Sequence, residues 1–219
     1  MGHNGGKGIP LVVMRRLPVY QRYLDELARL DIDRISSPEL AKRIGITASQ
    51  LRQDLSWFGS FGLQGYGYNV RELLKAINSI IGLDKENPMI LLGYGNLGRA
   101  IAGYEGFRRR NFQLLAAFDT NPAVHGPSEY GFNVYDTNEI PQFLDNNPVK
   151  IGIITTPAET AQKMVDLLVA HGVEGIWNFA PVRITAPPGV CVEHLHLVNS
   201  LMTLSLRLNQ KTPVNRQEN

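Results

Sequence analysis

The sequence predicts an α/β fold in which a small helical domain precedes a doubly wound parallel sheet. Two observations support this prediction. Up to residue 81 the apolar residues recur at helical spacing, as they do at Leu17, Tyr20, Leu24 and Leu27. From Pro88 onward short apolar runs alternate with amphipathic helices, which is the pattern of a parallel sheet with crossover helices. The predicted strands cover residues 89–92, 114–118, 151–155, 176–179 and 190–192.

Four segments follow from this pattern. The first domain covers residues 1–82 and the second covers 83–193, because Gly82 closes a helix and Pro88 opens the first strand. An amphipathic helix is expected at 194–208, with an apolar face that requires a partner surface. The polar remainder, 209–219, is predicted to be a flexible tail.

Charge is distributed unevenly along the 219-residue chain, whose formal net charge is +2. Residues 1–80 hold 11 Lys+Arg and 7 Asp+Glu, a net charge of +4, whereas residues 81–219 hold 11 and 13, a net charge of −2. A basic N-terminal third is a mild electrostatic signature of nucleic-acid binding, and a solvated surface explains it almost as well.

Composition also excludes several kinds of protein. The longest apolar runs fall far short of a membrane span and the glycine-rich start has no signal-peptide core, so we expect a cytoplasmic protein with no membrane partner. The single cysteine, Cys191, excludes an intramolecular disulfide framework and a cysteine-based metal cluster. We therefore expect no metal site.

Two capped helices joined by a glycine turn predict a helix-turn-helix. Ser36 and Glu39 have the spacing of a capping box, Gly45 ends that helix, and Thr47 and Gln50 repeat the spacing. The second helix has one apolar face, made of Ala48, Leu51, Leu55 and Phe58, and an opposite polar face. Glutamine and arginine on such a face can read adenine and guanine in the major groove. The alternative is a helix pair whose polar face is merely solvated.

The segment from Gly59 to Tyr68 alternates glycines with aromatic residues. It predicts a β-hairpin wing that lies along phosphates or in the minor groove, and the alternative is a glycine-rich linker between domains. Basic residues on the first and second helices are candidate phosphate contacts. The predicted DNA-binding residues are Arg15, Arg16, Lys42, Thr47, Ser49, Gln50, Arg52, Gln53, Ser56, Gly65 and Tyr66.

A Gly-x-Gly-x-x-Gly turn, formed by Gly93, Gly95 and Gly98, lies between the first predicted strand and a helix. The first glycine permits the tight turn, the second lets a pyrophosphate approach the backbone, and the third allows the helix to pack closely on the strand. Asp119 ends the next strand, where a carboxylate bonds the adenosine ribose hydroxyls. Residues 120–122 offer no arginine for a 2′-phosphate, so the motif predicts NAD(H) rather than NADP(H). A glycine turn without a ligand is the alternative.

Two further strand ends are candidates to line the nicotinamide, because ligands of open α/β sheets bind at the carboxyl ends of strands. They are Thr155-Thr156-Pro157 and Asn178-Phe179, and ordinary loop chemistry is the alternative for both. The predicted cofactor-binding residues from the motif and these ends are Gly93, Tyr94, Gly95, Asn96, Leu97, Gly98, Asp119, Thr155, Thr156, Pro157, Asn178 and Phe179.

A dehydrogenase would need substrate-anchoring and proton-transfer groups, and the sequence shows neither. Only 38 residues follow Pro181, and the histidines of the second domain have no partner spacing for acid–base work. We therefore predict no catalytic residues and a protein that is not an enzyme. The enzyme alternative survives only if the N-terminal domain supplies a substrate site.

The two halves together resemble the Rex family of redox-sensing transcriptional repressors, from about Pro10 to Leu208. The motifs that carry the resemblance are Ser36-Ser37-Pro38-Glu39-Leu40-Ala41, Arg52-Gln53-Asp54-Leu55, Phe58-Gly59-Ser60-Phe61-Gly62, Gly65-Tyr66-Gly67-Tyr68, Gly93-Tyr94-Gly95-Asn96-Leu97-Gly98 and Asn178-Phe179-Ala180-Pro181. The resemblance implies a homodimer that binds palindromic operator DNA, is released by NADH and is permitted to bind by NAD⁺. It also implies that the helix at 194–208 is exchanged between subunits.

The resemblance adds Tyr104 to the cofactor-binding residues, close to the nicotinamide with Arg16 and His196. Two departures from the family pattern matter. Many members have basic residues in the wing where this chain has Leu63 and Gln64, which bears on the wing's contacts to DNA. Some members have an acidic residue where His196 stands, so the contacts that switch the protein are expected to differ here.

Overall fold

The computed structural model describes residues 9–62 and 66–211, and of Lys211 it describes the backbone alone. The chain divides into two compact units, Met1–Lys85 and Glu86–Asn219. The predicted α/β class is confirmed, with a helical first unit and a parallel sheet in the second. Among the described helices, none combines the length and the apolar content needed to cross a membrane.

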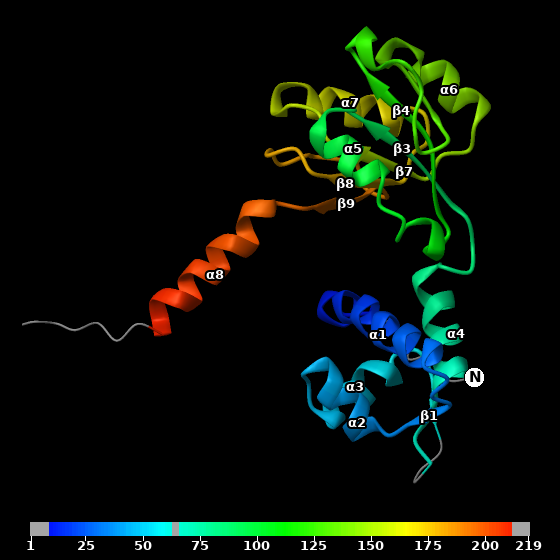
Figure 1. Ribbon diagram of the computed structural model, residues 1–219, viewed down its shortest axis with the longest axis vertical. Helices are drawn as coiled ribbons and strands as arrows, with labels where there is room; N and C mark the ends of the chain where they lie inside the picture. The colour runs from blue at the N-terminus through cyan, green and yellow to red at the C-terminus, as the bar shows by residue number, and fades with distance from the viewer. Residues whose placement is uncertain (1–8, 63–65, 212–219) are drawn as a thin grey trace, which may run out of the picture. The chain divides into compact units, whose positions relative to one another are not determined.

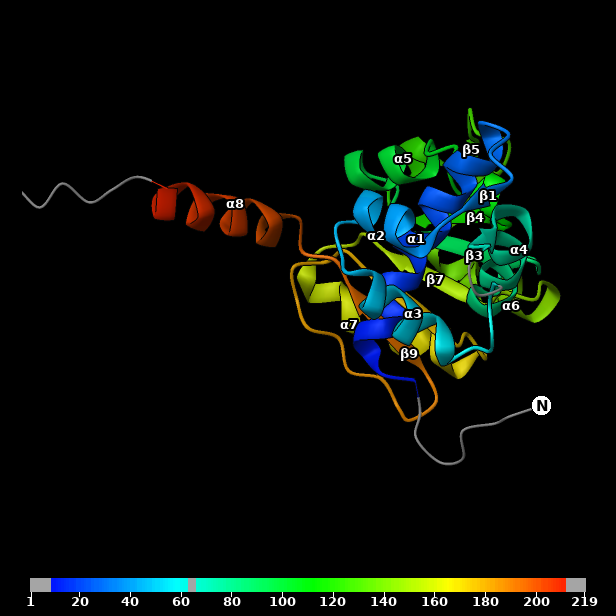
Figure 2. The ribbon, with the colours of Figure 1, turned by 90° about the horizontal axis from the view of Figure 1, so that it is seen from below.

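The described part of the first unit contains helices α1 to α4 and the short β1–β2 ladder (Figures 1 and 2). Its elements in order are α1 (Leu11–Arg29), β1 (Arg34–Ile35), α2 (Ser37–Ile44), α3 (Ala48–Ser56), β2 (Tyr68–Asn69) and α4 (Val70–Ile81). Apolar side chains from all four helices meet in one core, including Leu24, Leu40, Leu51 and Ile77, each fully buried. This core holds α2 and α3 as the predicted helix-turn-helix.

Local signals explain the bounds of α2 and α3. The Ser36 hydroxyl accepts a hydrogen bond from the Glu39 N–H at 3.3 Å, and Thr47 accepts one from Gln50 at 3.1 Å. Gly45 ends α2 at φ +84°, a left-handed conformation that glycine adopts without strain. The Glu39 carboxylate does not close the expected capping box and lies 3.8 Å from Arg43 instead.

The tip of the predicted wing, residues 63–65, lies outside the described residues. The described strand of this region, β2, pairs antiparallel with β1. Gly59, Gly62 and Gly67 all have positive φ, which interrupts an extended run. A Cβ on Gly67 would lie 2.5 Å from the Ile35 carbonyl oxygen, so glycine permits the close approach of β2 to β1.

The second unit is a seven-stranded sheet with the order β5-β6-β4-β3-β7-β8-β9. All neighbouring strands are parallel except β5 and β6. The strands are β3 (Asn87–Leu92), β4 (Phe112–Asp119), β5 (Gly126–Pro127), β6 (Asn133–Asp136), β7 (Ile151–Ile154), β8 (Gly175–Asn178) and β9 (Cys191–His194). The chain leaves β3 toward β4 on one side and returns to β7 on the other, so β3 and β7 flank the topological switch point.

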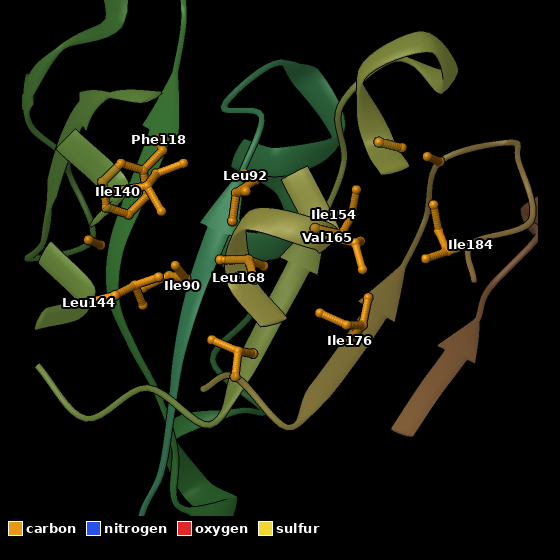
Figure 3. Close-up of a cluster of buried hydrophobic side chains, with 14 residues drawn as sticks. Ile90, Leu92, Phe118, Ile140, Leu144, Ile154, Val165, Leu168, Ile176 and Ile184 are labelled. Atoms are coloured by element: carbon orange, nitrogen blue, oxygen red, sulfur yellow. The ribbon is translucent and has the colours of Figure 1, made fainter. Parts of the chain in front are cut away.

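The α-helices of this unit are α5 (Asn96–Ala102), α6 (Ile140–Asn146), α7 (Ala158–Ala170) and α8 (Leu197–Lys211), and short 3₁₀ turns cover Arg108–Arg110, Pro122–Val124 and Thr137–Glu139. Alternate residues of β3 face opposite sides of the sheet. Ile90 and Leu92 pack with Val165 and Leu168 of α7 in the core that Figure 3 shows. The other face packs against Ile101 of α5. Helices therefore cover both faces, as the doubly wound prediction requires.

The structure extends the sheet beyond the five predicted strands. Strands β5 and β6 were not predicted, because β6 buries one side chain, Val134, and shows no apolar run. The fifth predicted strand begins and ends later than expected and includes His194. The predicted helix at 194–208 begins at Leu197 and runs to Lys211, so the first three residues of the expected tail are helical. Gln210 and Lys211 favour helix and no proline intervenes before Pro213, which explains the longer helix.

Candidate functional site

The glycine turn joins β3 to α5, and its backbone packs closely against neighbouring backbone at Gly93 and Gly98. Gly93 adopts φ +97°, and its N–H donates to the Phe118 carbonyl at 2.8 Å. A Cβ on Gly93 would lie 2.9 Å from the Thr155 backbone, and a Cβ on Gly98 would collide with the Gly93 carbonyl oxygen. A Cβ on Gly95 would meet nothing within 4 Å. Packing within the protein thus requires glycine at positions 93 and 98. At Gly95 no protein atom fills the space that a side chain would occupy, so a ligand can approach the backbone there.

A cleft of about 600 Å³ lies in front of this turn, at the carboxyl ends of β3, β4 and β7. Its lining residues are Gly93, Gly95, Phe118, Asp119, Thr120, Thr137, Thr155, Thr156, Pro157, Thr160 and Met164. Six of these were predicted from the sequence. Phe118, Thr120, Thr137, Thr160 and Met164 were missed, although Thr160 and Met164 follow Thr156 at the i, i+4 and i+8 spacing of one helix face.

Asp119 lines the cleft and also holds the glycine turn through hydrogen bonds. Its Oδ2 accepts a hydrogen bond from the Tyr94 N–H at 2.6 Å, and its Oδ1 accepts one from the Asn121 N–H at 2.8 Å. A carboxylate has about four lone-pair positions, so two remain for a ligand. The side chain can therefore hold the turn and accept hydrogen bonds from ribose hydroxyls at the same time.

Two threonines after β7 differ in their partners. The Thr155 hydroxyl lies 2.9 Å from the Leu92 carbonyl and 2.7 Å from the Gly93 carbonyl, so its proton ties β7 to the turn. The Thr156 hydroxyl oxygen is buried and has no hydrogen-bond partner within residues 9–62 and 66–211. An unpaired buried hydroxyl costs free energy, and a ligand in the cleft would relieve that cost.

The remaining residues of the glycine turn do not line the cleft. Tyr94 packs edge-on against Phe132, with ring centroids 6.1 Å apart, and Arg99 lies over the Tyr94 ring. Asn96, Leu97 and Gly98 form the first turn of α5 and are not among the residues that line the cleft.

The structure does not bring Tyr104, Asn178 or Phe179 into the cleft either. Tyr104 is 60% exposed beyond α5, where its ring meets Phe107 with centroids 5.0 Å apart. The Asn178 amide is fully buried, with Oδ1 accepting from the Ala180 N–H at 3.0 Å and Nδ2 donating to the Val182 carbonyl at 2.8 Å. Its Nδ2 also lies 3.0 Å from His194 Nδ1, so this side chain ties β8 to β9. Phe179 packs edge-on against Trp177, with ring centroids 4.5 Å apart.

The polar face of α3 is exposed as predicted. Ser49, Arg52, Gln53 and Ser56 are exposed, and Gln50 is half-buried. The Arg52 guanidinium donates to the Ser37 hydroxyl at 3.0 Å and the Ser56 hydroxyl donates to the Gln53 carbonyl at 2.7 Å. Arg15, Lys42, Thr47 and Tyr66 are also exposed, whereas Gly65, with Leu63 and Gln64, lies outside the described residues. The helix therefore offers a short row of donors and acceptors to a ligand surface.

Sequence reasoning missed the buried carboxylate of α3. Asp54 is 3% exposed and is bound by Arg16 and Tyr20 of α1. Two of the five donors of the Arg16 guanidinium are thereby used inside the unit, so its predicted phosphate contact would depend on the remaining three. A helix pattern alone cannot reveal such a pair, because Asp54 and Arg16 are 38 residues apart.

No cluster of three or more histidine, cysteine, aspartate or glutamate side chains that could hold a metal ion occurs in the part of the chain that the structure describes. Two family models match the two units in order. Residues 8–56 match one described as "Putative DNA-binding protein N-terminus", and residues 84–182 match one described as "CoA binding domain".

Curated relatives match nearly the whole chain. The redox-sensing transcriptional repressor Rex of Clostridium acetobutylicum is 50% identical over 204 residues, which are 93% of this chain and 95% of that protein. The repressor of the same name from Clostridium tetani is 49% identical over 205 residues, which are 94% of this chain and 97% of that protein. Both units and the order in which they occur are thus shared.

Solved structures agree with these relatives. A crystal structure described as RSP in complex with beta-NAD+ and operator DNA superposes with a TM-score of 0.89 at 46% identity, covering 94% of this chain and 95% of that chain. The crystal structure of RSP in complex with beta-NADH superposes with a TM-score of 0.86 at 43% identity. The match covers 94% of this chain and 97% of that chain. RSP is described as a Rex-family repressor. This chain therefore belongs to the Rex family of redox-sensing transcriptional repressors.

Proposed function

We propose that the first unit of this chain binds operator DNA and represses transcription, and that NADH bound in the cleft of the second unit releases it. One observation carries the proposal. Solved relatives at 43–46% identity over 94% of this chain are described with NAD⁺ and operator DNA in one case and with NADH in the other. The exposed polar face of α3 and the cleft beside Gly95 are the matching surfaces of this chain.

The ligand of the cleft is NAD(H) in this proposal. Asp119 stands where a carboxylate accepts hydrogen bonds from the adenosine ribose hydroxyls and repels a 2′-phosphate. The Thr156 hydroxyl is a further unpaired group at the same cleft. Gene expression would then follow the NADH/NAD⁺ ratio, and no turnover of the dinucleotide is required.

Release by NADH requires the dinucleotide to bind more tightly to the form of the protein that does not hold the operator. Couplings of this kind typically change affinity by about 5- to 150-fold. The operator affinity of the NADH-saturated protein is therefore expected to fall below that of the NAD⁺-saturated protein by a factor in this range. Fluorescence anisotropy on a duplex selected by the protein itself from a random library measures both affinities.

The anisotropy titration has two controls. Coenzyme A at the same concentration is expected to leave operator affinity unchanged, which tests whether the matched "CoA binding domain" description extends to the ligand. Turnover of NADH with a panel of carbonyl compounds would favour the enzyme alternative. Equal operator affinity under saturating NADH and NAD⁺ would refute the proposed switch.

We further propose that the protein is a homodimer in which α8 is exchanged between subunits. All side chains described for residues 197–210 are exposed in the single chain. One stripe of α8 is apolar, formed by Leu197, Leu201, Leu204 and Leu208 at helical spacing. A second copy of the chain offers a surface that would cover this stripe. A cytoplasmic location follows from the proposed DNA and NAD(H) partners.

Placing a lysine in the α8 stripe tests the dimer. Leu201 is 64% exposed in the single chain, and the Leu201→Lys substitution would bury a charge if a partner covers it. Light scattering after size exclusion is expected to show twice the 24.4 kDa chain mass for the wild type and a large shift toward one chain mass for the variant. Thr203→Lys, on the opposite side of α8, should remain dimeric. A dimeric Leu201→Lys variant would contradict the exchanged helix.

A further inference from the structure

The carboxylate of Asp54 links the polar helix α3 to α1 through three hydrogen bonds. Its Oδ2 accepts from the Arg16 Nε–H at 2.6 Å and from the Tyr20 hydroxyl at 2.5 Å, and its Oδ1 accepts from Arg16 Nη2 at 2.7 Å. Asp54 and Tyr20 are buried and Arg16 is partly exposed. The group is a bidentate ion pair completed by a phenol, which fixes both direction and distance.

The donors of this group hold their protons. Burial raises the pKa of the Tyr20 hydroxyl, and the hydrogen bond to Asp54 raises it further. The same carboxylate raises the pKa of the Arg16 guanidinium. Tyr20 is therefore a neutral donor and Arg16 a charged one throughout the range in which the protein binds ligands.

The rest of the buried face of α3 is apolar and restrains its rotation less sharply than the Asp54 hydrogen bonds do, and on the exposed side Arg52 adds a hydrogen bond to Ser37 of α2. Leu51 and Leu55 pack into the core, and such contacts are not directional. A rotation of about 10° moves an atom about 5.5 Å from the helix axis by about 1 Å. Donor–acceptor distances in hydrogen bonds vary by only about 0.5 Å, so a shift of this size is enough to break one. A rotation of this size would therefore misalign Gln53 and Ser49 with base edges while leaving the apolar packing nearly intact.

We propose that Asp54, held by Arg16 and Tyr20, is a positioning residue that sets the rotation of α3 and thereby the selectivity of this chain for its operator. The inference rests on the proposed function as a DNA-binding repressor. Asp54 itself faces away from the polar row that would read the bases, so it acts through Gln53, Ser49 and their neighbours. Selectivity is then expected to change more than general affinity for DNA.

A purely structural role is the competing explanation, and it makes a different prediction. A buried ion pair adds little net stability compared with well-packed apolar side chains, whereas removing one partner leaves a charge without compensation. A structural role would lower the melting temperature without altering the ratio of operator to nonspecific affinity. A positioning role lowers that ratio at temperatures where the variant is fully folded.

Tyr20→Phe and Asp54→Asn test the proposal. Tyr20→Phe keeps the ring and the Arg16–Asp54 pair and removes one hydrogen bond, and Asp54→Asn removes the charge that holds Arg16. Anisotropy with the selected operator and with a scrambled duplex of equal length measures the affinity ratio. We expect the ratio to fall about threefold for Tyr20→Phe and at least about tenfold for Asp54→Asn, an effect of the size that a mismatched base pair has. Affinity for the scrambled duplex should stay within about twofold of wild type.

Asp25→Asn is the matched control. Asp25 pairs with Arg29 on the surface of α1, so this variant removes the same charge from the same unit without touching α3. It should keep the wild-type ratio. NADH affinity of Tyr20→Phe and Asp25→Asn should equal that of the wild type, since both keep the Arg16–Asp54 pair and neither changes a residue that lines the cleft.

Each outcome of these measurements either supports or overturns the positioning role of Asp54. An unchanged ratio in folded Tyr20→Phe and Asp54→Asn proteins overturns the positioning role, whatever their melting temperatures. If Asp54→Asn does not fold, the ratio of Tyr20→Phe decides alone. If the wild-type chain itself fails to distinguish the operator from the scrambled duplex, the proposed function fails instead, and the positioning role falls with it.

Discussion

Replacing Gly95 with alanine is expected to lower the affinity for NADH about 100-fold, equivalent to about 2.7 kcal/mol, while leaving the melting temperature unchanged. Gly95 has φ −76°, which alanine adopts without strain, and its added Cβ would meet no protein atom within 4 Å. The space that the methyl group would occupy is where a pyrophosphate approaches the backbone. Isothermal titration calorimetry with NADH and a thermal melt measure the two effects.

Gly98→Ala separates ligand contact from folding. Its Cβ would collide with the Gly93 carbonyl oxygen, and the backbone there cannot yield as a side chain could. We expect this variant to lose about 1–3 kcal/mol of the free energy of unfolding, as overpacked cores do. Gly95→Ala should instead remain stable and remain on the operator in the presence of NADH. Wild-type NADH affinity in Gly95→Ala would show that the dinucleotide does not approach this turn.

The glycine turn and Asp119 could be predicted because their signals are local. A Gly-x-Gly-x-x-Gly run between a strand and a helix has few alternative structures, and Asp119 follows the next strand at the spacing of a mononucleotide-binding half. The caps at Ser36 and Thr47 are equally local. The structure places the turn and Asp119 at one cleft, and Ser36 and Thr47 accept the predicted hydrogen bonds from the Glu39 and Gln50 N–H groups.

Features that depend on tertiary packing were missed. Thr137 reaches the cleft because β6 joins the sheet beside β4, and β6 was too short and polar to be predicted. Thr160 and Met164 reach it because of the face that α7 turns toward the sheet. Asp54 looks like one more polar residue of α3 in the sequence, and its role appears only when α1 brings Arg16 and Tyr20 to it. Asn178 was assigned to the cofactor from its strand end, yet its amide serves the β8–β9 connection.

Replacing Asp119 with alanine is expected to lower NADH affinity about 10- to 100-fold, because a hydrogen bond to a charged group contributes about 1.5–3 kcal/mol. The variant also frees the Tyr94 and Asn121 N–H groups that Asp119 binds. Asp119→Asn removes the charge and keeps one of the two acceptor oxygens, so one of these N–H groups keeps its partner. Its NADPH affinity should fall less than its NADH affinity, since the repulsion of a 2′-phosphate is also removed. Operator binding without dinucleotide should be that of the wild type in both variants.

The matched control for Asp119 is Asp136, which pairs with it in register at the end of the next strand. The Asp136 carboxylate caps a 3₁₀ turn by accepting the Asn138 N–H at 2.8 Å and does not line the cleft. Asp136→Asn removes the same charge one strand away and keeps a good cap, so NADH affinity and the preference over NADPH should both stay unchanged. Fluorescence titration of the three variants with each dinucleotide compares them directly. An equal loss of NADH and NADPH affinity in Asp119→Asn would mean that Asp119 acts only by holding the turn, and the assignment of NAD(H) specificity to its charge would be wrong.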